Sequence, residues 1–295
     1  MGKYRVADPK PLIQASNQLD GGWCVHAPAK LNRFLHIIGR RADGYHNLET
    51  GFQFVDWADR IHVRRTSKPG IHLLEDPLGL GQDNLVSKAA HALPIPASVG
   101  IEIVIEKELP QGAGLGGGSS NAASTLVALN ELLDLQLSHH TLCAMGLTLG
   151  ADVPVFVHGR SCFATGVGEQ FQDTDWGGTE VLIATPPVHV STAAIFAHPK
   201  LTRNTPSCRI RASQLDTTSN DCEALVQTLH PEIRILMEAM TDIGQPRLTG
   251  TGASVFVIDP DHTASQALET VHRLAKVKLA LLRSHSMLYT SHAFA

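Results

Sequence analysis

The stretch of this sequence best suited to chemistry is a glycine-rich segment at residues 110–121. It reads Pro-Gln-Gly-Ala-Gly-Leu-Gly-Gly-Gly-Ser-Ser-Asn, so five of its twelve residues are glycine. Glycine lets a ligand approach the backbone closely and adopts positive φ angles without a steric penalty. The first N–H groups of a following helix have no intrahelical partner and point at such a ligand. The segment therefore predicts an anion-binding loop, and phosphate is the usual occupant.

The elements on either side support this interpretation. Residues 101–106 have the pattern of a β-strand, and residues 122–133 place apolar side chains on one broad helical face. The alternative is a flexible linker. Linkers of this composition do not usually separate an alternating strand from a well-formed helix.

Three known kinds of glycine loop can be compared with this one. No Gly-Lys-Ser/Thr closes the segment, so it is not a Walker A loop. Gly112, Gly114 and Gly117 match the G-x-G-x-x-G spacing of dinucleotide-binding proteins, but the match is weak because residues 106–110 intervene after the strand. No strand that ends in an acidic residue follows about 20 residues later. The third kind is a longer P-x-G-A-G-L-G-G-G-S-S loop, which matches residue for residue.

Two charged residues far from the loop are candidates for chemistry. Lys30 lies between apolar positions just after Pro28, in a segment whose composition favours a strand. A lone lysine is more often a solvated surface residue. Asp152 follows Gly150 and precedes a short apolar run, and a helix-end or turn aspartate is an equally good interpretation.

Bulk composition limits the class of protein. The chain has 295 residues, 43% of them hydrophobic, and a net charge of −4, so it can form a sizeable core and is not a general nucleic-acid binder. No apolar run approaches the roughly 20 residues of a membrane span. Its five cysteines are scattered without a C-x-x-C pair, which predicts neither a zinc site nor disulfides and favours a cytoplasmic location.

The length predicts about two domains. We expect a loosely held N-terminal extension at residues 1–21, one domain at residues 22–165 and a second at residues 166–295. Further expected strands lie at 23–27, 31–37, 51–55, 61–65, 255–258 and 278–283, with an acidic turn at 56–59 joining the third to the fourth. Helices are expected at 84–93, 138–149 and 264–274, and at 221–240 with a break at Pro231. Residues 192–197 are expected to form a short helix or turn, and residues 201–213 a polar loop.

The third kind of loop belongs to the small-molecule kinases that include galactokinase, homoserine kinase and mevalonate kinase, and the chain resembles this superfamily. Residues 28–32 (Pro-Ala-Lys-Leu-Asn) and 248–254 (Leu-Thr-Gly-Thr-Gly-Ala-Ser) match two further superfamily motifs in the right order. Segments 39–46, 147–156 and 203–206 resemble the 4-diphosphocytidyl-2-C-methyl-D-erythritol kinases of the non-mevalonate isoprenoid pathway. The resemblance covers roughly residues 22–285. It implies an α+β two-domain small-molecule kinase fold, with an N-terminal ribosomal-protein-S5-like ATP-binding domain and a C-terminal ferredoxin-like substrate domain.

The resemblance also implies roles for individual residues. Asp152 would accept the proton of the substrate hydroxyl, and Lys30 would lie beside it and keep the carboxylate charged. ATP with Mg²⁺ would be the donor, with unknown metal ligands. The implied ATP-binding residues are Lys107, Pro110, Gln111, Gly112, Ala113, Gly114, Leu115, Gly116, Gly117, Gly118, Ser119 and Ser120. The implied substrate-binding residues are Asn32, Tyr45, His46, Thr192 and Phe196, with the cytosine stacked between Tyr45 and Phe196 and its edge bonded to His46.

Other classes of protein stay open as alternatives. A kinase acting on mevalonate or homoserine is the nearest alternative, although a cytidine-stacking tyrosine in segment 43–46 would have no role with those substrates. A nucleotide-binding module without catalysis would need neither Lys30 nor Asp152. A dinucleotide-dependent oxidoreductase comes third. We expect a small-molecule substrate, no nucleic acid or membrane partner, a monomer or homodimer, and no contact between the site and residues 1–20 or 68–82.

Overall fold

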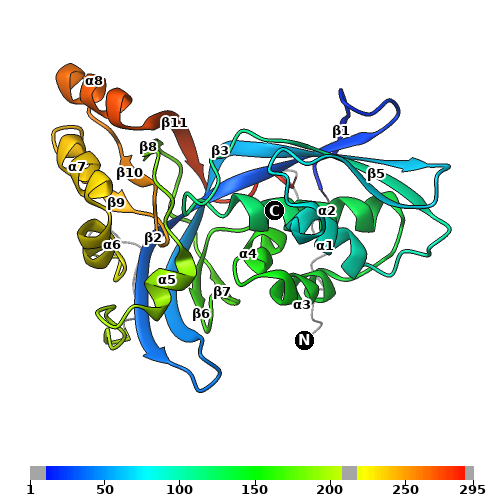
Figure 1. Ribbon diagram of the computed structural model, residues 1–295, viewed down its shortest axis with the longest axis horizontal. Helices are drawn as coiled ribbons and strands as arrows, with labels where there is room; N and C mark the ends of the chain where they lie inside the picture. The colour runs from blue at the N-terminus through cyan, green and yellow to red at the C-terminus, as the bar shows by residue number, and fades with distance from the viewer. Residues whose placement is uncertain (1–10, 208–217, 290–295) are drawn as a thin grey trace, which may run out of the picture.

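The computed structural model describes residues 11–207 and 218–289, and within them the chain forms a mixed sheet with helices packed on it (Figure 1). The strands are β1 Gln14–Ala15, β2 Trp23–Arg40, β3 His46–Thr66, β4 Gly70–Glu75, β5 Gly100–Glu106, β6 Cys162–Thr165, β7 Gln170–Asp173, β8 Glu180–Thr185, β9 Arg247–Leu248, β10 Val255–Ile258 and β11 Lys276–Arg283. The helices are the short 3₁₀ helix Gly81–Asp83, α1 Leu85–Ala92, α2 Gly117–Leu132, α3 His139–Leu149, α4 Val153–His158, α5 Thr192–Ala197, α6 Glu223–Leu229, α7 Pro231–Met240 and α8 Ser265–Leu274.

A long antiparallel ribbon of β2 and β3 runs through the whole molecule (Figure 1). The expected break between strands at 23–27 and 31–37 is absent, because β2 continues through Pro28 by shifting register between Pro28 and Lys30. The prediction of an acidic turn at 56–59 is wrong. β3 runs unbroken for 21 residues, and Asp59 lies inside it with a fully buried side chain.

The first half of the chain packs four helices against one end of this ribbon. Strand β5 pairs antiparallel with β3 and parallel with β4, and α1–α4 cover the same face of the sheet (Figure 1). Asn84 caps α1 and Ser138 caps α3, each accepting a backbone N–H in the first turn. Helix α2 buries ten consecutive residues, Ser120–Leu129, so the glycine-rich segment is attached to the centre of this core.

The second core lies at the other end of the ribbon. Strands β9, β10, β8 and β11 follow one another in the sheet, and β11 also pairs with β3 through Leu282 and Arg283. Helices α6, α7 and α8 lie beside these strands (Figure 1), and Pro231 separates α6 from α7 as expected. Leu288 and Tyr289 return to the first core.

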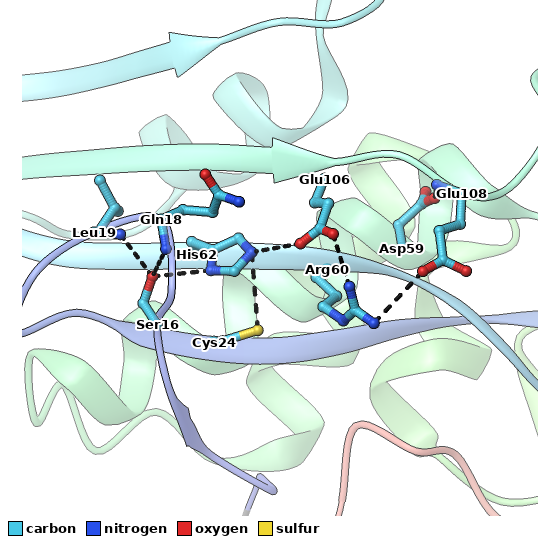
Figure 2. A network of polar contacts seen from close by, with 9 residues as sticks. All are labelled: Ser16, Gln18, Leu19, Cys24, Asp59, Arg60, His62, Glu106 and Glu108. Atoms are coloured by element: carbon cyan, nitrogen blue, oxygen red, sulfur yellow. Dashed lines mark hydrogen bonds and ion pairs between the residues drawn. The ribbon is translucent and has the colours of Figure 1, made fainter.

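The expectation of a loosely held N-terminal extension is wrong for the part of it that the structure describes. β1 pairs with β2, and the Leu12 N–H donates to the Leu288 carbonyl. Figure 2 shows that the Ser16 hydroxyl accepts from the N–H groups of Gln18 and Leu19 and bonds Nδ1 of the buried His62 at 2.9 Å. This contact ties the segment to β3. Residues 1–10, and residues 208–213 of the expected polar loop, lie outside the described residues.

Candidate active site

The glycine-rich segment borders a cavity of about 530 Å³ that lies between the two cores. Residues far apart in the sequence line it, from β2, β3, the glycine loop, the start of α4, α5 and the turn at 249–252. The lining comprises Lys30, Asn32, Leu35, Leu48, Thr50, Phe52, Pro77, Leu78, Leu80, Asp83, Asn84, Leu85, Ile105, Lys107, residues 110–119, Asn121, Ala151, Asp152, Val167, Thr192, Phe196 and residues 250–252.

The glycine loop requires glycine at the points where it passes other backbone. Gly112, Gly114 and Gly116 have φ angles of +62°, +74° and +72°, and Gly116 is the N-cap residue of α2. A Cβ atom on Gly114 would lie 2.2 Å from the Thr249 carbonyl oxygen. The loop therefore packs directly on the turn at 249–252, and its helix N-terminus faces the cavity.

Lys30 lies on the cavity wall with a side chain only 3% exposed. Its ammonium group contacts three oxygens: Asn32 Oδ1 at 2.5 Å, the Gly114 carbonyl at 3.3 Å and Asp152 Oδ2 at 3.3 Å. The Phe52 ring lies 5.4 Å from the nitrogen. An ammonium group has three hydrogens, so these acceptors hold its charge at a fixed point next to the loop.

Asp152 lies at the N-terminus of α4, but its side chain makes no capping hydrogen bond. The carboxylate points to Lys30 instead and is 38% exposed, on the wall of the cavity. The simple capping interpretation therefore does not apply. The pair combines a buried cation with a carboxylate that a ligand can reach.

A set of hydrogen bonds holds Asn32 in register with the loop. The Asn32 backbone N–H donates to Thr249 Oγ1 at 3.0 Å, and that hydroxyl donates to the Gly114 carbonyl at 3.3 Å. The Asn32 side-chain amide donates to Thr50 Oγ1 at 2.9 Å. Register shifts on both sides of Lys30 and Asn32 mark β-bulges, which re-aim side chains next to active sites.

Lys107 lines the cavity and forms an ion pair with Asp59. The other oxygen of Asp59 accepts the N–H groups of Glu108 and Leu109 at 2.8 Å each. The fully buried Asp59 therefore fixes the segment that leads into the glycine loop. Asp59 thus supports the candidate site, a role that the sequence pattern does not predict. Its only signal in the sequence is that it alternates with the apolar Trp57 and Ile61 on one face of a strand.

Of the predicted substrate residues, Asn32, Thr192 and Phe196 line the cavity, whereas His46 lies behind Phe196 and is not part of the lining. The Thr192 hydroxyl bonds that of Thr251 at 2.8 Å. The rings of His46 and Phe196 are 5.3 Å apart between centroids and inclined by 34°. Tyr45 is 61% exposed and does not line the cavity in this structure, so its stacking role stays a prediction.

Apolar residues of segment 68–82 line another part of the cavity, contrary to expectation. Segment 68–82 was expected to avoid the site, yet Pro77, Leu78 and Leu80 line the cavity together with Leu85 and Ile105. An apolar wall of this kind suits the flat face of a nucleobase. Only the folded chain brings this segment next to Lys107 and the loop.

The two serines of the loop differ. Ser119 lines the cavity, whereas Ser120 is fully buried in the core behind it and its hydroxyl has no hydrogen-bond partner. Among the described residues, no group of three or more His, Cys, Asp or Glu side chains is placed to hold a metal ion.

Comparison with known proteins identifies the class. Residues 84–160 match the family described as GHMP kinases N terminal domain. A crystal structure of mevalonate kinase superimposes with a TM-score of 0.63 at 15% identity, covering 89% of this chain and 99% of that one. The fold is therefore that of the GHMP kinases, which confirms the expected α+β kinase fold.

The curated relatives narrow the class to one family. Kinases named 4-diphosphocytidyl-2-C-methyl-D-erythritol kinase from Shewanella oneidensis and Pseudomonas syringae are 46% and 47% identical, over 82% and 80% of this chain and 86% and 84% of theirs. A crystal structure of 4-(cytidine 5'-diphospho)-2C-methyl-D-erythritol kinase superimposes with a TM-score of 0.74 at 31% identity, covering 88% of this chain and 98% of that one. This protein belongs to the 4-diphosphocytidyl-2-C-methyl-D-erythritol kinase family.

In the part of the chain that the structure describes, no helix has the length and apolar character needed to cross a membrane. Cys24, Cys143, Cys162 and Cys222 are free thiols.

Proposed function

We propose that this protein transfers the γ-phosphoryl group of ATP to the 2-hydroxyl of 4-diphosphocytidyl-2-C-methyl-D-erythritol. The observation that carries the proposal is the contact of Lys30 with both Asp152 and the glycine loop on one cavity wall, with separations of 3.3 Å. Phosphoryl transfer requires reactants held in line and positive groups near the transferring phosphate. The names of the relatives support the choice of acceptor.

In this mechanism Asp152 orients the acceptor hydroxyl and takes its proton. The carboxylate is reachable from the cavity, whereas the ammonium of Lys30 is held behind it by three oxygens. Lys30 thus keeps a positive charge next to the oxygens that become more negative during transfer. The N–H groups at the start of α2 supply further positive potential on the phosphates.

The donor and the acceptor would enter from opposite ends of the cavity. We infer that the nucleobase of ATP lies against Pro77, Leu78 and Leu80, with its phosphates on residues 110–119. The cytosine of the acceptor would lie at the end lined by Phe196, with Tyr45 closing over it. Thr192 and Asn32 would contact the chain between cytosine and the reacting hydroxyl.

Mg²⁺ would bind mainly through ATP. Because no acidic cluster is placed to hold it among the described residues, phosphate oxygens and water would provide most ligands, which is the usual mode for this ion. The Ser119 hydroxyl on the cavity wall fits one further position. When bound, the ion would neutralise charge on the phosphates.

An ATP-consumption assay that compares the cytidine substrate with mevalonate and homoserine tests the acceptor. Phosphorylation of the cytidine substrate alone is the expected result, and a faster reaction with either alternative would reassign the acceptor. Asp152→Asn tests the mechanism. We expect nearly normal ATP binding and a loss of transfer of about 10²–10⁴-fold. Turnover within about tenfold of the wild type would exclude Asp152 as the base.

A further inference from the structure

Arg203 lies in the family-specific segment 203–206, and its side chain connects both walls of the predicted cytosine site. Its Nε–H donates to Nε2 of His46 at 3.0 Å. Its Nη2 group donates to the carbonyls of Phe196 and His198 at 2.8 and 2.7 Å, and Nη1 donates to the Leu201 carbonyl at 3.1 Å. One guanidinium therefore fixes His46 from β3 and the end of α5 relative to each other.

The contact with Arg203 determines which nitrogen of His46 carries the proton. A guanidinium group can only donate hydrogen bonds, so Nε2 of His46 must be the acceptor. A neutral imidazole has one donor and one acceptor nitrogen. Nδ1 of His46 therefore carries the hydrogen, and a side chain that is 8% exposed has little freedom to turn over.

Burial and the neighbouring positive charges both disfavour a second proton on His46. Burial is the main cause that lowers the pKa of His46, and the positive charges of Arg203 and Arg40 lower it further. Arg40 faces it from β2, where the two residues are paired in register. Phe196 on α5 adds an aromatic ring without charge. A second proton would place an N–H against the Nε–H of Arg203.

We propose that Arg203 is a specificity-determining positioning residue that presents His46 as an Nδ1–H donor to a pyrimidine base. Cytosine has an acceptor at ring nitrogen N3, whereas uracil has a hydrogen there. A fixed Nδ1–H donor on His46 can bond N3 of cytosine. Against uracil it would face the N3–H group and lack an acceptor, which is costly for a buried donor. The inference deepens the proposed function, on which it rests for the identity of the base.

Kinetic comparison of Arg203→Lys and Arg203→Gln with the wild type tests this role. Arg234→Lys is the matched control, because Arg234 forms an exposed ion pair with Glu238 on α7. The two substrates are the cytidine compound and its uridine counterpart. We expect the Arg203 variants to raise KM for the cytidine substrate about tenfold and to lose most of the preference for cytidine. KM for ATP and kcat should stay within about threefold.

Two kinetic outcomes overturn the proposal. In folded variants, an unchanged preference for cytidine excludes Arg203 from base selection. Equal losses of ATP binding, kcat and cytidine binding indicate a purely structural role. A double variant with His46→Gln adds a check, since Arg203→Lys should cost less once His46 is gone, when only the bonds to the carbonyls of Phe196, His198 and Leu201 are left to lose. Fully additive losses would show that Arg203 does not act through His46.

A spectroscopic measurement tests the inference without any substrate. Nitrogen-15 NMR of the histidines, assigned with His46→Gln, should show an Nδ1–H tautomer for His46 in the free wild-type protein. In Arg203→Gln, His46 should lose this fixed tautomer and titrate at higher pH. An Nε2–H tautomer in the wild type overturns the inference even if the proposed reaction is correct. Absence of turnover with the cytidine substrate refutes the proposed function but leaves the tautomer result valid.

Discussion

Gly114→Ala tests the packing that brings the glycine loop to Lys30. The residue has a φ of +74°, and alanine in this left-handed region costs about 1–2 kcal/mol. The new Cβ would lie 2.2 Å from the Thr249 carbonyl oxygen and 2.9 Å from that of Gly252. Both obstacles are backbone, so they cannot turn away as a flexible side chain could. Overpacking of this kind costs about 1–3 kcal/mol, and the total loss of unfolding free energy should be about 2–5 kcal/mol.

Gly21→Ala is the matched control. Gly21 has a similar φ of +66°, but nothing lies within 4 Å of a Cβ built on it. Its replacement should cost only the backbone part, about 1–2 kcal/mol. The difference between the two variants, about 1–3 kcal/mol, therefore measures the contact between the loop and the turn at 249–252.

Urea unfolding and steady-state kinetics on both variants provide the readout. The Gly114 carbonyl accepts hydrogen bonds from Lys30 and Thr249, so Gly114→Ala should also lose activity, whereas Gly21→Ala should keep it. Equal stability of the two variants within about 0.5 kcal/mol, with activity retained in both, would refute the close packing.

Two further predictions concern buried groups on β3. Asp59→Asn leaves Lys107 without its charged partner, so it should lower the unfolding free energy by about 3–5 kcal/mol and raise KM for ATP. The control is Glu238→Gln, which breaks an exposed ion pair and should lower the unfolding free energy by less than about 1 kcal/mol. Equal losses in the two variants would contradict the role of burial. Burial is the main cause that lowers the pKa of His62 below 6.5, so the unfolded chain binds more protons and stability should fall as pH drops below about 6.5. His62→Gln should flatten that slope in urea titrations between about pH 5 and 7, and an unchanged slope would show that His62 does not contribute.

The local chemistry of the site could be predicted from the sequence because it is encoded in short contiguous patterns. The glycine loop, its helix and the caps at Asn84 and Ser138 depend on residues close in the chain. The kinase family followed from ordered motifs, and the comparisons confirmed it. The domain boundaries and the roles of individual site residues stay predictions.

The errors have a common physical cause. The acidic residues at 56 and 59 predict a turn, whereas Asp59 lies inside β3. Its partners, Lys107 and the N–H groups of Glu108 and Leu109, lie 48 to 50 residues away. Likewise, Pro77 and Leu78 carry no motif and reach the cavity only through tertiary packing. In both segments, contacts between residues far apart in the sequence determine the structure, and sequence periodicity does not encode such contacts.

The unbroken strand β3 also limits how members of this family can vary in length. His46 lies at its start, Thr50 contacts Asn32, and Asp59 fixes the entry to the glycine loop. The distance along the strand from His46 to Asp59 is set by a rise of about 3.3 Å per residue, roughly 40 Å in all. Inserting or deleting one residue between them would move every following side chain to the opposite face of the sheet. Insertions and deletions should therefore gather in the turns at 41–45 and 67–69, while the interval from 46 to 59 keeps a constant length.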